Sequence, residues 1–336
     1  MMGCSIVVGG QWGDEAKGKI CSYLALADNI ALSCRAGLGP GAGHTVVHGG
    51  RDFKLRQTAS AFINNQTRLL LGAGVLLNTD VLLEEVERLG IEGRVGIDPR
   101  ATLLEQHHRS AEGDDANLSR TIGSTGSGHG PGLADRALRR ARLAADEPRL
   151  QHLLTDVAKE ANDCLDRGET VLVEGTNGYL LSVLYGTYPF TVGKDSTAST
   201  AAADIGIGPT RVEEVIVTFK SYPTRVGPGP FATEMPAAEA ETRGFQQFGT
   251  VTGRLRRVGE FDFAAAADAA RVNGATQIAL THLDWLDPDC RHRPMSDWQP
   301  KLLRFIERVE DACNRPATLL GTGPDTYDIV DRRRAS

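Results

Sequence analysis

The chain has 336 residues, of which 41% are hydrophobic and 24% charged, and its formal net charge is −6. Because acidic and basic residues are interspersed, this composition excludes a basic groove for nucleic acid or a patch for a membrane surface, and it is typical of a globular protein. No segment approaches the roughly 18 apolar residues of a membrane span, and the six scattered cysteines form no C-x-x-C pair. We expect a cytoplasmic protein, in the host cytoplasm if its source is viral, with a single domain over residues 1–336 that contains inserted helical and loop regions.

The first predicted elements are a strand, a glycine-rich turn and a helix. The β-branched run Ile6–Val8 leads into the sequence GGQWGDEAKGK, and apolar residues recur at helical spacing over residues 20–26. Such a turn presents backbone N–H groups and a helix N-terminus to an anion. It does not match the Walker pattern, because no G-x-x-x-x-G-K-[ST] string fits and Asp14 and Glu15 lie within it. Since a carboxylate beside a polyphosphate is repulsive without a metal ion or a proton between them, we interpret Asp14 as a chemical group. An ordinary turn with solvated acids is the alternative.

Strands and helices alternate along the rest of the chain. Strands are expected over residues 30–35, 69–74, 94–98, 170–174, 213–220 and 276–280. Helices are expected over residues 79–89, with Thr79 as the N-cap, and over residues 156–167 and 298–313. Because a strand, a helix and a second strand form a right-handed parallel crossover, this order predicts an α/β fold with a mainly parallel central sheet flanked by helices.

Two further glycine-rich loops could approach a ligand closely. Residues 37–43 contain four glycines and a proline, and His44, an imidazole candidate, follows them directly. A plain surface histidine is the alternative there. Residues 122–132 place hydroxyl groups among glycines ahead of a predicted basic helix, whose arginines are Arg136, Arg139, Arg140 and Arg142. This arrangement suits a phosphomonoester, and a solvated basic face explains it equally well.

The remaining candidates are two histidines, a group of arginines and a late aspartate. His107, His108 and the acidic, polar residues 112–117 are expected to form a solvated loop. Neither histidine has a carboxylate or thiol neighbour at metal-ligand spacing, so both are unassigned. Residues 249–257 place three arginines beside two hydroxyls, which can clamp a dicarboxylate; a generic basic loop is the alternative. Asp284 follows a predicted strand, at the edge where open parallel sheets bind their ligands.

Taken together, these loops resemble the successive signatures of the adenylosuccinate synthetase family. The matching strings are GGQWGDEAKGK, AGHTVV, IGSTGSGHGP, VLVEGTNG, GTYPFTV, TRVGPGPFATE, GTVTGRLRR, THLD and GTGPD. They occur in the family's order from residue 5 to residue 331, and the chain looks closest to the compact archaeal and viral members. The resemblance implies a P-loop-like α/β fold and a homodimeric ligase that couples L-aspartate to C6 of a purine nucleoside monophosphate. It also implies a nucleoside triphosphate, Mg²⁺ and a 6-phosphoryl intermediate.

The resemblance also assigns roles to individual residues. It implies that Asp14 is the base and a Mg²⁺ ligand, that His44 is the acid, that Lys17 neutralises phosphates and that the Gly43 carbonyl reaches the metal. The acceptor nucleotide is expected at Gly41, Ser124, Thr125, Arg139, Asn177 and Val192, with Arg139 reaching across a dimer interface. L-aspartate is expected at Thr252, Arg254 and Arg256. The triphosphate is expected at Gly13, Glu15, Ala16, Lys17, Gly18, Gly43, His44, Thr45, Asp284, Gly321, Gly323 and Pro324.

Several residues depart from the family pattern. The family usually has Asn, Thr, Gln and Thr, respectively, at the positions of Gly41, Ser124, Asn177 and Val192. All four positions lie around the acceptor in the family. A lysine that reads guanine is replaced by His282, a phosphate-loop glycine by Ala16 and an arginine by Leu255. These changes predict an altered pair of nucleotides on an intact catalytic core.

We therefore predict dGMP as the acceptor and ATP or dATP as the donor, because shortened side chains would leave room for a 2-amino group. The product would be N6-succino-2-amino-2'-deoxyadenylate for diaminopurine DNA, as in a viral branch of the family. Some members of that branch have Ser at the position of Asp14, so the aspartate in this chain argues against it. IMP with GTP is the alternative. A non-catalytic nucleotide-binding module is another, although such a module would have no reason to keep Asp14, His44 and the arginines together.

Overall fold

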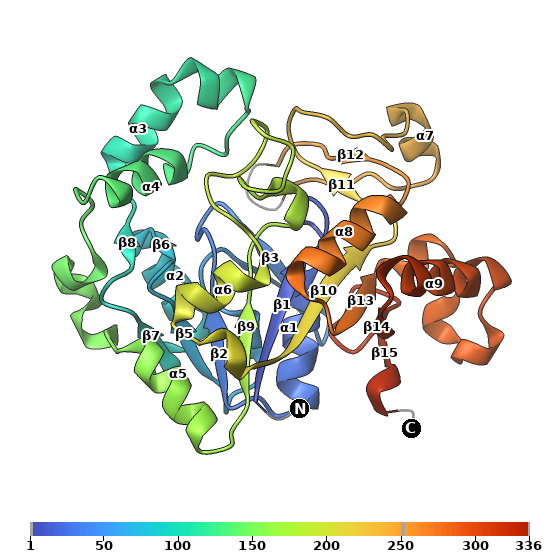
Figure 1. Ribbon diagram of the computed structural model, residues 1–336, viewed down its shortest axis with the longest axis horizontal. Coiled ribbons are helices and arrows are strands. Elements are labelled where there is room, and N and C mark those ends of the chain that lie inside the picture. The colour runs from blue at the N-terminus through green and yellow to red at the C-terminus, as the bar shows by residue number, and fades with distance from the viewer. Residues whose placement is uncertain (1–2, 250–252, 335–336) are drawn as a thin grey trace.

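The computed structural model describes residues 3–249 and 253–334, and it consists of a central sheet with helices on both faces (Figure 1). Within these residues the sheet has nine strands in the order β15-β14-β13-β10-β1-β9-β2-β5-β7. Neighbouring strands are parallel throughout, except that β14 and β15 are antiparallel. The prediction of a mainly parallel sheet flanked by helices is confirmed.

The predicted strands all occur, with boundaries that differ by up to three residues. The sheet contains β1 (Cys4–Gly9), β2 (Leu32–Arg35), β5 (Arg68–Leu71), β7 (Val95–Ile97), β9 (Val171–Glu174), β10 (Val212–Lys220), β13 (Gln277–Thr281), β14 (Ala317–Gly321) and β15 (Ile329–Asp331). Short strands pair outside it: β3 (His44–His48) with β4 (Arg51–Leu55), β6 (Leu76–Leu77) with β8 (Thr102–Leu103), and β11 (Thr224–Arg225) with β12 (Arg257–Val258). The helices are α1 (Lys17–Ala27), α2 (Thr79–Leu89), α3 (Gln106–Asp114), α4 (His129–Ala137), α5 (Val157–Asp166), α6 (Ala198–Ile205), α7 (Ala237–Thr242), α8 (Phe263–Asn273) and α9 (Pro300–Cys313). Over the two described ranges, no helix has the length and apolarity needed to cross a lipid bilayer.

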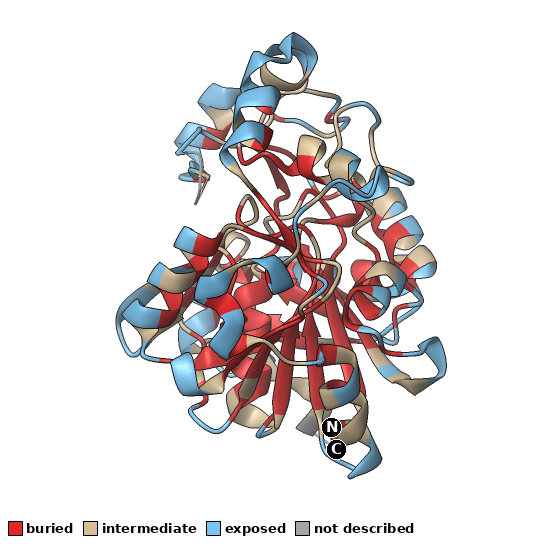
Figure 2. Ribbon diagram, turned by 90° about the vertical axis from the view of Figure 1, so that its left-hand side faces the viewer, coloured by how far each residue is buried: buried red, intermediate tan, exposed pale blue. Residues whose placement is uncertain are grey.

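The central strands are apolar on both faces because each face packs against helices. In β1, Ile6 and Val8 belong to the cluster that includes residues of α6 and α8. Val7 points to the opposite face and packs in a cluster with Ile20 and Leu24 of α1. This alternation follows from the two-residue period of a strand. Figure 2 shows the resulting buried strands between more exposed helices, which explains why these segments read as continuous apolar runs.

Three local predictions about helices are wrong. The N-cap of α2 is Asn78, whose Oδ1 accepts the Val81 N–H at 3.1 Å, and Thr79 lies inside the helix. Much of the stretch expected to be a solvated loop, up to Asp114, belongs to α3, because His108 and Glu112, one helical turn apart, share a buried face. The predicted basic helix ends at Ala137, so most of its arginines lie beyond α4.

Candidate active site

The loops that carry the candidate residues emerge from one edge of the sheet. Asp14, Gly41, Asn177 and Asp284 follow the carboxyl ends of β1, β2, β9 and β13, respectively. Because these strands are parallel, their carboxyl ends meet at the same edge, where open α/β sheets bind their ligands. Segments far apart in the sequence therefore converge.

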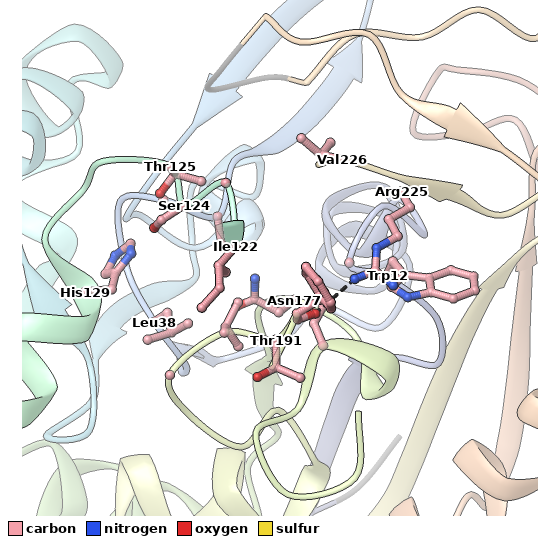
Figure 3. Close-up of a pocket in the computed structure, with 18 of the residues that line it drawn as sticks. Trp12, Leu38, Ile122, Ser124, Thr125, His129, Asn177, Thr191, Arg225 and Val226 are labelled. Atoms are coloured by element: carbon pink, nitrogen blue, oxygen red, sulfur yellow. Dashed lines mark hydrogen bonds between the residues drawn. The ribbon is translucent and has the colours of Figure 1, made fainter. Parts of the chain in front are cut away.

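A cavity of about 430 Å³ lies among these loops (Figure 3). This volume falls within the range of about 300–1,000 Å³ that is typical of small-molecule sites. Predicted residues that line it are Gly13, Asp14, Gly41, Gly43, Ser124, Thr125, Asn177, Val192, Arg254 and Arg256. Of the residues expected at the triphosphate, only Gly13 and Gly43 are among its lining residues. The cavity thus combines the residues expected at the acceptor with those expected at aspartate.

Glu15 organises the turn between β1 and α1 from within. Its Oε1 accepts the N–H groups of Gln11 at 2.9 Å and of Gly13 at 2.8 Å, and its Oε2 pairs with Lys17 Nζ at 2.9 Å. Glu15 is 1% exposed, so the alternative of a turn with solvated acids is wrong for this residue. Ala16 has φ +59°, a left-handed conformation that glycine adopts more readily, which explains the family's preference at this position.

Asp14 lies on the cavity wall, with its side chain 23% exposed. Its Oδ2 pairs with Arg256 Nη1 at 2.6 Å and with Lys220 Nζ at 3.2 Å, and it accepts a hydrogen bond from the Thr224 hydroxyl. Burial alone would raise the pKa of Asp14, but Lys220, Arg256 and Thr224 hold it below its ordinary value. Burial in turn lowers the pKa of Lys220 to about 8. Asp14 is therefore ionised at neutral pH.

His44 belongs to a buried cluster with Arg35 and Glu174. Its Nδ1 contacts both partners, and Arg35 Nη1 lies 2.7 Å from Glu174 Oε1. Burial and Arg35 lower the pKa of His44 to about 4, whereas Arg35 and His44 outweigh burial and lower the pKa of Glu174 to about 2. A Cβ added to Gly18 would lie 3.1 Å from the Cβ of His44, so the imidazole sits against the first turn of α1. Its Nε2 is buried and lacks a hydrogen-bond partner in the described part of the chain.

The residues expected to hold the acceptor nucleotide differ in their environments. The hydroxyl of Ser124 donates to Glu112, whose other oxygen accepts the Gly128 N–H, so Ser124 holds its own loop together. Asn177 has φ +60°, and its Oδ1 is buried without a partner among residues 3–249 and 253–334. Val192 packs against an apolar cluster that contains Leu38.

Arg139 does not reach the cavity of its own chain. It is exposed beyond the end of α4, has φ +60° and is not among the lining residues. A role at the acceptor would require a second copy of the chain.

The structure describes two of the three residues that are expected to bind L-aspartate. Thr252 lies outside the described residues. Arg254 lines the cavity and donates from Nη1 to the Gly123 carbonyl at 2.8 Å, while Arg256 contacts Gln247 Oε1 at 3.0 Å in addition to Asp14. Leu255 is 51% exposed, so the missing arginine leaves no gap in the cavity wall.

Several residues expected at the triphosphate lie in the loop after β14, which a lysine of α1 holds in place. Lys19 Nζ donates to the carbonyls of Asp325 at 2.7 Å and Asp328 at 2.9 Å, and to that of Gly323. Burial raises the pKa of the half-buried Asp284, although Lys19 opposes it. His282 lies with its ring 5.2 Å from that of Trp285, and burial and Lys220 hold its pKa well below the ordinary value. A neutral ring thus stands where the family has a lysine.

Sequence reasoning missed Arg35, Glu174 and Lys220. Each is a charged residue at the last position of a buried parallel strand. Charged side chains are rarely buried unless they are paired. A charged residue at the end of an apolar strand, at the edge where ligands bind, could therefore have indicated these three residues from the sequence.

His107 and His108 have a carboxylate neighbour that their spacing did not indicate. Their Nε2 atoms lie 3.3 Å and 3.1 Å from Oδ2 of Asp135, which is brought in by α4. However, Nδ1 of His108 accepts the Glu105 N–H at 3.0 Å. A neutral His108 therefore carries its proton on Nε2 and donates it to Asp135, which leaves no lone pair there for a metal. The cluster joins α3 to α4.

Comparisons with known proteins identify the family and support the fold. The sequence model described as adenylosuccinate synthetase matches residues 6–147 and 141–290. The adenylosuccinate synthetase of Methanocaldococcus jannaschii is 48% identical over 99% of this chain and 98% of its own, and that of Pyrococcus horikoshii is 51% identical over 98% of both. The structure of the fully ligated Plasmodium falciparum enzyme has a TM-score of 0.91 at 22% identity, covering 97% and 99% of the two chains, and so shows the fold. The succinoaminodeoxyadenylate synthetase of cyanophage S-2L, bound to dGMP and dATP, has a TM-score of 0.83 at 27% identity, covering 98% and 95%.

Proposed function

The chain belongs to the adenylosuccinate synthetase family of carbon–nitrogen ligases, and we propose that it couples L-aspartate to IMP with GTP and so forms adenylosuccinate. The observation that carries this proposal is Asp14, an ionised carboxylate on the cavity wall that Lys220 and Arg256 hold. The archaeal adenylosuccinate synthetases that are 48% and 51% identical over nearly the whole chain support IMP as the acceptor.

Asp14 would act as the general base. It takes the N1 proton of the purine while O6 attacks the γ-phosphorus, GDP leaves, and the amino group of L-aspartate then displaces the phosphate from C6. A base must be unprotonated before it can accept a proton, and the cations around Asp14 keep its pKa low. Arg254 and Arg256 would clamp the carboxylates of L-aspartate. When Arg256 leaves Asp14 to bind the substrate carboxylate, Asp14 loses a neighbouring positive charge that lowers its pKa. Asp14 would then become a stronger base.

The residues around Asp14 fit a Mg²⁺ ion. Mg²⁺ prefers oxygen ligands, and the carboxylate of Asp14 and the backbone of Gly43 both line the cavity. Lys220, Arg256 and Thr224 all contact Oδ2, so Oδ1 is not used by these three partners. When bound, Mg²⁺ would neutralise charge on the transferring phosphoryl group.

His44 would donate a hydrogen bond to the transferring phosphoryl group. Its unpartnered Nε2 and its position against the first turn of α1 suit that role, because a helix N-terminus favours an anion. Glu174 contacts the opposite nitrogen and would stabilise the imidazolium as phosphate oxygens approach. Lys17, which is now paired with Glu15, would turn toward the phosphates.

Two of the four altered acceptor positions are already engaged by other residues of the chain. The space beside Gly41 is filled by His129, because a Cβ added to Gly41 would lie 2.3 Å from Cε1 of that ring. Ser124 directs its hydroxyl to Glu112. The argument that shortened side chains make room for a 2-amino group is therefore weaker than the sequence suggested, and IMP is the first choice.

The predicted dGMP activity remains the second candidate, and Asn177 favours it. Its Oδ1 is a buried hydrogen-bond acceptor without a described partner on the cavity wall. The 2-amino group of dGMP is a donor that IMP lacks. The likeness to the dGMP-bound cyanophage structure supports this candidate at 27% identity. The replacement Asn177→Gly removes the amide and suits the left-handed backbone, so it should lower the activity with dGMP more than the activity with IMP.

We further propose that the active enzyme is a homodimer in which Arg139 of one copy contacts the acceptor in the other. Its exposure outside its own cavity supports this arrangement, as does the exposed apolar side chain of Leu138 beside it. A two-fold dimer would place the same patch on both copies.

A direct assay tests the reaction. The purified protein is incubated with L-aspartate and Mg²⁺, with IMP or dGMP as acceptor and with GTP, ATP or dATP as donor, and the products are identified by mass spectrometry. Adenylosuccinate from IMP is the expected product. A succinylated product from dGMP alone would replace the first candidate with the second, and no product from any pair would favour a nucleotide-binding module.

A further inference from the structure

The ring of His129 occupies space that Gly41 leaves open at the cavity wall. A Cβ added to Gly41 would lie 2.3 Å from Cε1 of His129 and 3.1 Å from Oγ1 of Thr125. All three residues line the cavity, and Figure 3 shows His129 on the same side as Thr125 and opposite Trp12. His129 is only 8% exposed, so its ring is held in place by its neighbours.

One ring nitrogen of His129 lacks a partner. Its Nε2 is buried and makes no hydrogen bond to any residue that the structure describes. Burial and the nearby Arg56 lower the pKa of His129 to about 4, so the ring is neutral at physiological pH and has one donor and one acceptor. Buried polar atoms are nearly always paired. The other ring nitrogen, Nδ1, lies 2.9 Å from the position of a Cβ added to Gly41, so it faces the cavity wall, where it can donate a hydrogen bond to a ligand.

The surroundings of His129 favour an anion with oxygen acceptors. Arg56 adds a cation beside the loop of Gly41, because its Nε donates to the Pro40 carbonyl at 2.9 Å, and Thr125 adds a hydroxyl group. His129 is also the first residue of α4, a nine-residue helix whose N-terminus favours negative charge. The carboxylate of Glu112, which also lines the cavity, accepts hydrogen bonds from Ser124 and Gly128, which offset its charge.

We propose that His129 contacts the phosphate group of the acceptor nucleoside monophosphate by donating a ring N–H in the space beside Gly41. The proposal rests on the proposed function only in that the acceptor is a purine nucleoside monophosphate. It holds for IMP and for dGMP alike, because both carry the same phosphate. His129 would then be a specificity residue that distinguishes nucleotide from nucleoside.

The test compares a nucleotide with its nucleoside. The Kd values of IMP and inosine, and of dGMP and deoxyguanosine, are measured by titration calorimetry for the intact protein and for His129→Leu. The variant should bind the preferred nucleotide about tenfold more weakly or worse, because a hydrogen bond to a charged group is lost. Its affinity for the nucleoside should not change. His129→Gln, which restores a donor, should recover part of the loss.

Gly41→Ala provides an independent perturbation of the same contact. The added Cβ would displace the ring, so this variant should weaken nucleotide binding as His129→Leu does. The double variant should be no worse than either single one. His152→Leu is the matched control, because His152 lies on the surface, where it pairs with Glu92.

Two outcomes would overturn the proposal. Equal losses for nucleotide and nucleoside would place His129 at the base or sugar, or show that it only supports the fold. An unchanged nucleotide Kd in both His129 variants would show that it does not contact the ligand. If the protein binds dGMP and not IMP, the proposed acceptor fails, and the dGMP pair still tests His129.

Discussion

Replacing Glu174 with Gln should destabilise the fold, because the residue supplies the negative charge that pairs with Arg35 and His44 in its buried cluster. Its side chain and that of Arg35 are both 0% exposed, and Oε2 also accepts the Ser60 N–H at 2.6 Å. Glutamine has nearly the same shape, so the replacement removes the charge and leaves the packing intact. Arg35 would keep its bond to the Ala42 carbonyl at 3.0 Å but would have no counterion.

Two estimates of the cost agree. Removing one partner of a buried ion pair costs about 3–5 kcal/mol. The pKa of Glu174, about 2 against its ordinary 4.5, corresponds to about 3 kcal/mol at about 1.36 kcal/mol per unit. An unfolding entropy of about 2.1 cal/mol/K per residue over 336 residues means that 1 kcal/mol shifts Tm by about 1.4 °C. The variant should therefore lose about 4–7 °C.

Calorimetry at pH 7 measures this loss, and Glu160→Gln is the matched control. Glu160 pairs with Arg68 at 2.7 Å, but the two side chains are 30% and 32% exposed. An exposed pair contributes less than about 1 kcal/mol, so the control should shift Tm by about 1 °C or less. Equal shifts in the two variants would refute the reasoning that burial gives the Glu174 cluster its strength.

Four other predictions follow from the same contacts. The lowered pKa of Glu174 stabilises the wild type above about pH 4.5, and this contribution should be lost as the pH falls toward 2. Calorimetry over this pH range should show a smaller loss of stability for Glu174→Gln, which has no carboxylate to protonate at this position. Asp14→Asn should abolish turnover in the product assay while nucleotide Kd changes little, because the base and one Mg²⁺ ligand are lost and the residues expected to hold the nucleotides stay in place. Ala16→Gly should raise Tm by about 1 °C, because glycine adopts φ +59° without strain. A mixture of inactive Arg139→Ala and Asp14→Ala chains that exchange subunits should recover about a quarter of the wild-type activity, because a mixed dimer has one intact site; no recovery would contradict the shared site.

The sequence predicted the strands and the ligand-binding edge well because both depend on local pattern. Short apolar runs such as residues 69–71 are typical of strands that helices cover on both faces. Glycine-rich segments mark the loops at which the chain leaves these strands. The cause of α3 is long-range, since His108 and Glu112 are polar residues that become buried through Asp135, Ser124 and Gly128. No spacing in the sequence indicates those partners.

The free volume beside a residue could not be predicted from the local sequence either. Gly41 reads as a lost side chain and hence as extra room, yet His129, 88 positions later, fills that room. The volume at one position depends on neighbours contributed by other loops. A prediction of substrate from shortened side chains therefore needs the packing around each one.

Asp14 and Glu15 show how the fold gives adjacent carboxylates different tasks. Gly13 and Ala16 both adopt positive φ, so the chain turns sharply on either side of the pair. Glu15 is directed inward, where two N–H groups and Lys17 consume its hydrogen-bonding capacity. Asp14 is directed outward to the cavity, where its partners are the side chains of Lys220 and Arg256 and not its own backbone. Proton transfer needs a group whose partners can be exchanged for substrate. Asp14 meets that requirement, and Glu15, bound to its own backbone, does not.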